Sequence, residues 1–122
     1  MQKIENCIKN NTKAILMETP ANPTMKVYDI QEISKICKKH NILLIVDNTT
    51  ATQISTSPLE LGADIVWYSL TKYIGGHSDA LAGSIALNDE HISKRLFDLL
   101  GTCGLNLSPL TSYLVLRGLY TF

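Results

Sequence analysis

The feature that most constrains the fold is a run of five apolar residues at positions 42–46, which follows a helical pattern. A continuous apolar run of this length is typical of a strand buried within a parallel sheet. At residues 29–39 the apolar side chains recur at helical spacing, with Asp29 as N-cap and Glu32 three residues later. Another apolar run, at residues 14–17, precedes this helix. Strand, helix and strand in this order predict a βαβ unit with a right-handed crossover.

The remainder of the chain predicts further strands and helices. Apolar stretches at residues 63–68 and 80–87 predict two more strands, the second broken by Gly83. Helical patterns predict helices at residues 89–100 and 109–119. Alternating strands and helices are typical of an α/β fold with a mostly parallel sheet and flanking helices. Because few helices are available to cover the sheet, we expect a thin hydrophobic core.

Charge and cysteine content argue against several classes of function. Eleven basic residues balance eleven acidic ones, so nothing favours nucleic acid or a membrane surface as a partner. The apolar runs are too short to span a bilayer, and residues 1–13 show no secretory signal. Three widely spaced cysteines argue against a disulfide framework and against a zinc site. We therefore expect a single cytoplasmic domain without a metal.

Two polar clusters follow predicted strands, at residues 47–49 and 69–72. Ligands of open α/β sheets bind outside the carboxyl ends of the strands, where both clusters are expected. The clusters supply an acid, an amine and hydroxyls, which is the set that pyridoxal phosphate (PLP) requires: the amine for its aldehyde, the acid for its ring nitrogen and the hydroxyls for its phosphate. An amine must be uncharged to attack an aldehyde, so Lys72 needs a partly desolvated pocket, which we expect the cofactor to supply once its phosphate is anchored at Ser69 and Thr71.

Each residue of these clusters has a plainer interpretation when it is taken alone. An acidic residue after a strand more often caps a turn, and a Ser-x-Thr pair does the same. A single loop lysine is usually solvated. The order of the residues and their wider context favour the cofactor site.

Several separated motifs resemble, in the same order, those of the trans-sulfuration (Cys/Met metabolism) family of PLP-dependent enzymes. This family includes cystathionine γ-synthase, the cystathionine lyases and methionine γ-lyase. The motifs are Glu18-Thr19-Pro20-Ala21-Asn22-Pro23, Val46-Asp47-Asn48-Thr49 with Ala51-Thr52, Pro58-Leu59-Glu60-Leu61-Gly62-Ala63-Asp64, Ser69-Leu70-Thr71-Lys72-Tyr73, Gly76-His77-Ser78-Asp79, Leu107-Ser108-Pro109 and Leu116-Arg117-Gly118-Leu119.

The resemblance implies a role for each of six site residues. It implies Lys72 as the Schiff-base lysine and Asp47 as the partner of the pyridine nitrogen. The other four would contact the cofactor: Ser69 and Thr71 at its phosphate, Asn22 at its ring hydroxyl and Thr49 against its ring. Glu18 matches an acidic residue near the family's active site, with its role left open. Leu70 and Thr50 depart from the family pattern, which concerns substrate fit and packing more than the cofactor.

The resemblance also implies a fold and an activity. Residues 1–122 would form part of the large PLP-binding domain of a fold-type I (aspartate aminotransferase-like) enzyme, specifically its central portion, within a family homotetramer. The reaction would be elimination or replacement at the β or γ carbon of cystathionine, methionine, homocysteine or an activated homoserine, with a lyase favoured. The alternative is a truncated, non-catalytic fragment or an interaction module that needs the remainder. An aminotransferase is disfavoured by the Gly-His-Ser-Asp context at residues 76–79.

Other conspicuous residues have structural interpretations. We expect His77 to bond backbone rather than act as a base, and the glycines at 75–76 to form a turn rather than a phosphate cradle. Trp67 and Tyr68 are expected to fill the core or an interface, and Cys103 to be an incidental loop cysteine. The basic residues Lys35, Lys38 and Lys39 are expected on the solvated face of a helix.

Overall fold

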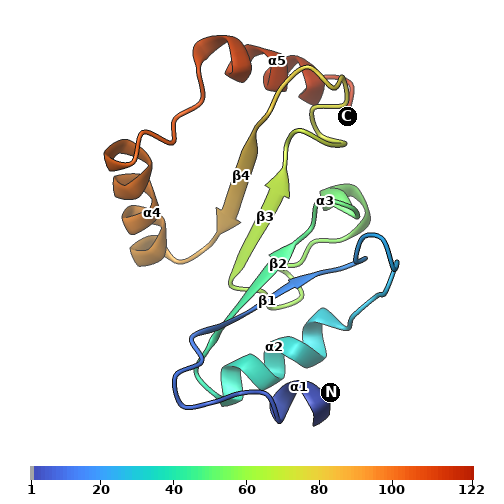
Figure 1. Cartoon of the computed structure of the whole chain (residues 1–122), viewed down its shortest axis with the longest axis vertical. Coiled ribbons are helices and arrows are strands. Elements are labelled where there is room, and N and C mark those ends of the chain that lie inside the picture. Colours follow the sequence, from blue (N-terminus) through green and yellow to red (C-terminus); the bar gives the residue numbers. More distant parts are fainter. Residues whose placement is uncertain (1) are drawn as a thin grey trace.

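A four-stranded sheet is the centre of the fold in the computed structural model, which describes residues 2–122 and the side chains of residues 3–122. Its strands lie in the order β1 (Ala14–Glu18), β2 (Leu43–Asp47), β3 (Ile65–Ser69) and β4 (Gly83–Leu87). The first three run parallel, whereas β4 runs antiparallel to β3 (Figure 1). The predicted α/β fold with a mostly parallel sheet is confirmed.

The three long helices were all predicted, and side-chain caps explain where they begin. They are α2 (Ile30–Lys39), α4 (Glu90–Thr102) and α5 (Pro109–Leu119). Asp29 accepts a hydrogen bond from the Glu32 amide at 3.0 Å, as its predicted role as N-cap requires. Two helices of four residues each, α1 (Gln2–Glu5) and α3 (Thr52–Ser55), were not predicted, because a single turn carries no apolar periodicity.

The start of the last strand corrects one prediction. Residues 80–82 form a loop, and Gly83 begins β4 instead of breaking a longer strand. The reason lies next to the sheet, where the Thr71 hydroxyl donates a hydrogen bond to the Ala82 carbonyl at 3.2 Å and accepts one from its amide at 3.0 Å. Ala82 is therefore held by the Thr71 side chain as well as by the Thr71 amide, which donates to the Ala82 carbonyl at 3.3 Å.

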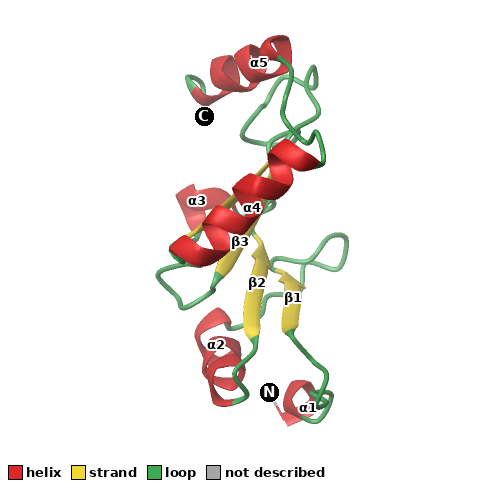
Figure 2. Ribbon diagram, turned by 90° about the vertical axis from the view of Figure 1, so that its left-hand side faces the viewer, coloured by secondary structure: helices red, strands yellow, loops and turns green. Residues whose placement is uncertain are grey.

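The hydrophobic core lies on one face of the sheet, the face that α2 covers (Figure 2). Its buried residues are Ile30, Ile33, Cys37, Ile42, Leu44, Val46, Ala63 and Val66. The other face is largely bare: Leu16, Trp67 and Ile85 are 62%, 45% and 52% exposed. The core is therefore thin, as predicted, and Trp67 is not part of it, whereas Tyr68 packs against it.

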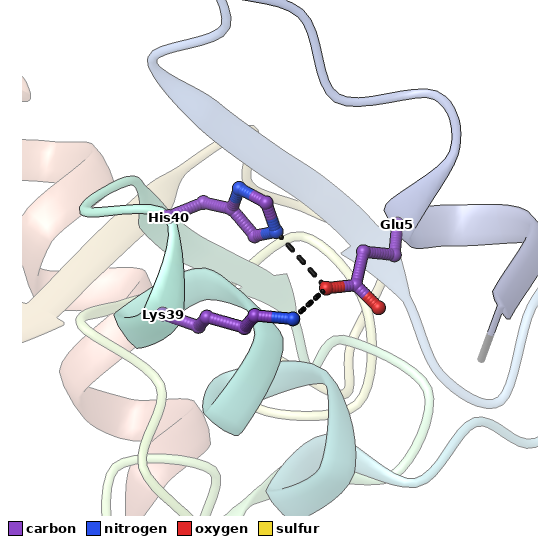
Figure 3. Close-up of polar contacts among 3 residues, drawn as sticks. All are labelled: Glu5, Lys39 and His40. Atoms are coloured by element: carbon purple, nitrogen blue, oxygen red, sulfur yellow. Dashed lines mark hydrogen bonds and ion pairs between the residues drawn. The ribbon is translucent and has the colours of Figure 1, made fainter.

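An ion-pair cluster joins α1 to the end of α2 (Figure 3). The Glu5 carboxylate accepts hydrogen bonds from Lys39 Nζ at 2.7 Å and from His40 Nε2 at 3.1 Å. The bond from Lys39, then that from His40, lowers the pKa of Glu5 below its usual value of 4.5. Lys35 and Lys39 are both exposed, as predicted.

No helix within residues 2–122 is long and apolar enough to cross a membrane.

Candidate functional site

A cleft of about 1060 Å³ opens at the carboxyl ends of β1, β2 and β3. All six site residues expected from the sequence line it: Asn22, Asp47, Thr49, Ser69, Thr71 and Lys72. They come from three separate segments, namely the loop after β1, the end of β2 with the residues after it, and the end of β3 with the turn after it. The fold thus brings to one place residues that the sequence separates by up to 50 positions, as between Asn22 and Lys72.

Asp47 and Ser69 project from the same face of the sheet, the one opposite α2. Asp47 is in register with Trp67 on the neighbouring strand, and Ser69 lies two residues beyond Trp67. Paired residues share a face, and so do residues two apart on one strand. Glu18 is in register with Asp47 on the other side and also lines the cleft. An acid and a hydroxyl therefore face the cleft from adjacent strand ends.

Thr49 links these two strand ends. Its amide donates a hydrogen bond to Asp47 Oδ1 at 2.9 Å, and its hydroxyl accepts one from the Ser69 amide at 2.8 Å. The first bond orients the carboxylate, and it leaves Oδ2 for another partner. The second bond ties the end of β2 to the end of β3. Thr49 therefore has a structural role that the sequence pattern did not indicate.

Lys72 lies in a tight turn directly after β3. Its amide donates to the Ser69 carbonyl at 3.2 Å, and its carbonyl accepts from the Gly76 amide at 2.8 Å. The side chain of Lys72 is exposed, and it forms no ion pair with any residue from 3 to 122. Within the described residues Lys72 is therefore accessible from the cleft, and the desolvated pocket that the cofactor is expected to supply stays a prediction.

The two hydroxyls beside Lys72 differ in their freedom to donate. A hydroxyl has one proton, and Thr71 donates its proton to the Ala82 carbonyl. The Ser69 hydroxyl has no hydrogen-bond partner within the described part of the chain. Ser69 is therefore the better placed of the two to donate to an anion in the cleft, and Thr71 mainly anchors the start of β4.

Asn22 approaches the cleft from the loop that follows β1. An isolated bridge between Ala21 and Lys26 closes this loop, with the Ala21 amide donating to the Lys26 carbonyl at 2.9 Å. Asn22 is exposed at the tip of the loop, and Met25 beside it also lines the cleft. The amide group of Asn22 is thus available to a ligand.

The segment after Lys72 contains cleft residues that the sequence analysis noted only as a motif. Ser78 and Asp79 both line the cleft. His77 Nδ1 lies 2.7 Å from the Gly75 carbonyl, so the prediction that it bonds backbone is confirmed. A Cβ on Gly75 would lie 2.4 Å from the Leu70 carbonyl oxygen, and Gly76 has a φ of 70°, which confirms their role in a turn.

Within residues 2–122, no group of three or more His, Cys, Asp or Glu side chains is arranged to bind a metal ion. All three cysteines are free. Cys103 is exposed at the C-cap of α4, in keeping with an incidental cysteine.

Comparison with known proteins gives consistent results. Residues 1–122 match the model of a family described as Cys/Met metabolism PLP-dependent enzyme. The chain is 47% identical over 121 residues to a cystathionine γ-synthase/O-acetylhomoserine (thiol)-lyase of Bacillus subtilis, covering 96% of this chain and 32% of that protein. It is 46% identical over 121 residues to a cystathionine β-lyase of Lactococcus lactis, covering 99% of this chain and again 32% of the relative.

A solved structure shows the same fold. The crystal structure of cystathionine γ-lyase from Lactobacillus plantarum complexed with L-serine superposes with a TM-score of 0.93 at 39% identity. The match covers 97% of this chain and 31% of that one. The chain therefore spans about a third of the length of the relatives that it matches.

Proposed function

Because the chain belongs to the Cys/Met metabolism family of PLP-dependent enzymes, we propose that its cleft forms the lysine-bearing part of a PLP site acting on sulfur-containing amino acids. The observation that carries this proposal is the convergence of Asp47, Ser69 and Lys72 on one cleft at the carboxyl ends of the strands. PLP, when bound, supplies an electron sink for negative charge at the α carbon of an amino acid.

The side chains of the cleft fit this cofactor chemically. Lys72 provides the amine that reacts with the aldehyde group, and its exposure leaves the amine accessible. Asp47 has one carboxylate oxygen bonded to the Thr49 amide and the other left to pair with a protonated ring nitrogen. Ser69 contributes a hydroxyl proton for the phosphate. Thr71, Asn22 and Thr49 complete the proposed set.

In the reaction, Lys72 is the residue that moves protons. With the cofactor bound, the Lys72 amino group would take the proton from the α carbon of the substrate and return a proton toward the γ carbon. Asp47 would pair with the ring nitrogen and so favour its protonated form, which is the form that acts as an electron sink. Thr49 holds the Asp47 carboxylate in place through its amide.

The reaction class that we propose is β- or γ-elimination or replacement, with elimination as the first choice. The substrate would be cystathionine, methionine, homocysteine or an activated homoserine. The relatives include both a synthase and lyases, which supports the shared chemistry without selecting a branch. We further propose that residues 1–122 form part of a PLP-binding domain within a cytoplasmic homo-oligomer. The three free cysteines are consistent with a reducing compartment.

A non-catalytic fragment, or a module that pairs with the remainder of such an enzyme, is a second candidate. Two observations favour it, namely the exposure of Lys72 and the bare apolar face of the sheet.

Borohydride reduction of the chain in the presence of PLP distinguishes these candidates. We expect peptide mapping to place the pyridoxyl mass on Lys72 in preference to Lys94, an exposed lysine on α4 that serves as an internal control. Equal labelling of the two lysines would contradict the proposed site and favour the second candidate.

A further inference from the structure

Helix α5 contacts the Lys72 turn through a glycine. A Cβ on Gly118 would lie 2.3 Å from the carbonyl oxygen of Gly75 and 2.8 Å from the Cα of Gly75, and real Cβ atoms do not approach other atoms this closely. Both glycines are buried. The backbone of α5 therefore rests directly on the backbone of the turn, three residues after Lys72, and only glycine at position 118 permits this approach. Figure 1 shows α5 beside the loops that join β3 to β4.

A second contact joins the same helix to the far end of the same segment. Arg117, the residue before Gly118, forms an ion pair through Nη2 with Asp79 Oδ2. Asp79 lines the cleft that contains Lys72. Adjacent residues of one helix thus hold the segment that follows Lys72 at two points, Gly75 and Asp79.

The segment between these points has few other ties. Backbone hydrogen bonds from Gly75 to Leu70 and from Gly76 to Lys72, both 2.8 Å, shape the turn itself. Residues 76–79 are exposed. The contacts of α5 with Gly75 and Asp79 therefore add to the bonds that hold the turn against the sheet carrying Asp47 and Ser69.

We propose that Arg117 and Gly118 are positioning residues that hold the Lys72 turn over the strand ends, so that the lysine faces the same cleft as Asp47. This inference rests on the proposed role of Lys72 and adds α5 to the machinery of the site. Arg117 acts through Asp79, and Gly118 acts through the Gly75 backbone. Neither residue contacts the cofactor in this proposal.

Two measurements on the same samples test the positioning role. The first is amide hydrogen exchange at Gly75 and Gly76, whose amides close the Lys72 turn. The second is the ratio of pyridoxyl label on Lys72 to label on Lys94. In Arg117→Gln and in Asp79→Asn we expect several-fold faster exchange and a several-fold lower ratio, with the thermal midpoint of the whole chain little changed. Arg117→Lys keeps the charge and should preserve both values.

The test includes a matched control variant and a second variant that breaks the same ion pair. Arg95→Gln removes an exposed arginine of α4 and should change neither measurement. If Arg117→Gln fails to fold, Asp79→Asn breaks the same ion pair from the exposed loop. Unchanged exchange and an unchanged label ratio in the folded variants would overturn the proposal. A wild-type chain without preference for Lys72 would instead contradict the proposed function, while amide exchange would still show whether α5 holds the turn.

Discussion

The amide of Ser69 donates a hydrogen bond of 2.8 Å to the hydroxyl of Thr49, and this bond joins the carboxyl ends of β2 and β3. Because Thr49 also donates its amide to Asp47, one residue is bonded both to the acid and to the residue that carries the free hydroxyl. Thr49 thus supports the geometry of the cleft, whereas its place in the sequence motif implied only a contact with the cofactor ring.

Replacement of Thr49 by valine tests this link. Valine has nearly the same shape but no acceptor, so the Ser69 amide loses its partner, and we expect a loss of about 1 kcal/mol in the free energy of unfolding. Urea denaturation measures it. Thr49→Ser retains the hydroxyl and should lose much less. A valine variant as stable as the wild type would show that the bond contributes nothing.

Asp47→Asn should lower turnover of the active enzyme by orders of magnitude while some PLP remains bound. A neutral amide does not hold a proton on the ring nitrogen, so the cofactor becomes a poor electron sink. Steady-state kinetics and cofactor absorbance provide the two readouts. Glu60→Gln, at an exposed glutamate outside the cleft, is the control for a general loss of negative charge. Wild-type turnover in the Asp47 variant would refute the assignment.

The two hydroxyls beside Lys72 should have different roles: that of Ser69 should bind the cofactor, and that of Thr71 should stabilise the fold. Ser69→Ala should weaken PLP binding with little effect on stability, because its hydroxyl has no partner in the described chain. Thr71→Val should cost about 1 kcal/mol of stability, because the Ala82 amide loses its acceptor. Titration with PLP and thermal unfolding of both variants check this. The opposite pattern would reverse the two roles.

The Glu5 cluster should make stability depend on pH in the acid range. The pKa of Glu5 is lowered in the folded chain, so its contribution is complete above the unfolded pKa and is lost as pH falls through the lower folded pKa. Glu5→Gln should therefore flatten the fall of the thermal midpoint below about pH 4.5, since the neutral amide does not titrate. Glu60→Gln, at an exposed glutamate that forms no ion pair with the described residues, should leave the profile unchanged. Added salt should reduce the difference because the cluster is exposed.

The bare face of the sheet should make the 122-residue chain prone to association. Leu16 lies on β1, which pairs only with β2 in the described sheet, and it is 62% exposed. Unpaired edges and apolar faces promote contact between chains. Leu16→Lys should shift sedimentation profiles toward the monomer. Val27→Lys, at an apolar side chain that is 75% exposed in a loop away from the sheet edge, is the control. A monomeric wild-type chain with cooperative unfolding would contradict this expectation.

The helices, strands and strand ends were predictable because they depend on residues that are close together in the sequence. The apolar run at residues 42–46 predicted β2 to within one position at each end, and the Asp29 cap predicted the start of α2. Polar residues directly after strands predicted where a ligand would bind, and all six site residues do line one cleft. Periodicity, capping and strand ends involve neighbours within a few residues, so the sequence by itself determined them.

Only the tertiary structure decided how distant segments support the site. Arg117 and Asp79 lie 38 positions apart, and Thr49 and Ser69 lie 20 apart. The approach of Gly118 to Gly75, the start of β4 at Gly83 and the exposure of Lys72 likewise follow from packing. Such contacts form between elements whose relative placement depends on burial over the whole chain, and no local pattern records which pairs will meet. The motifs determined which chemical groups are present, and the packing decided how they are held.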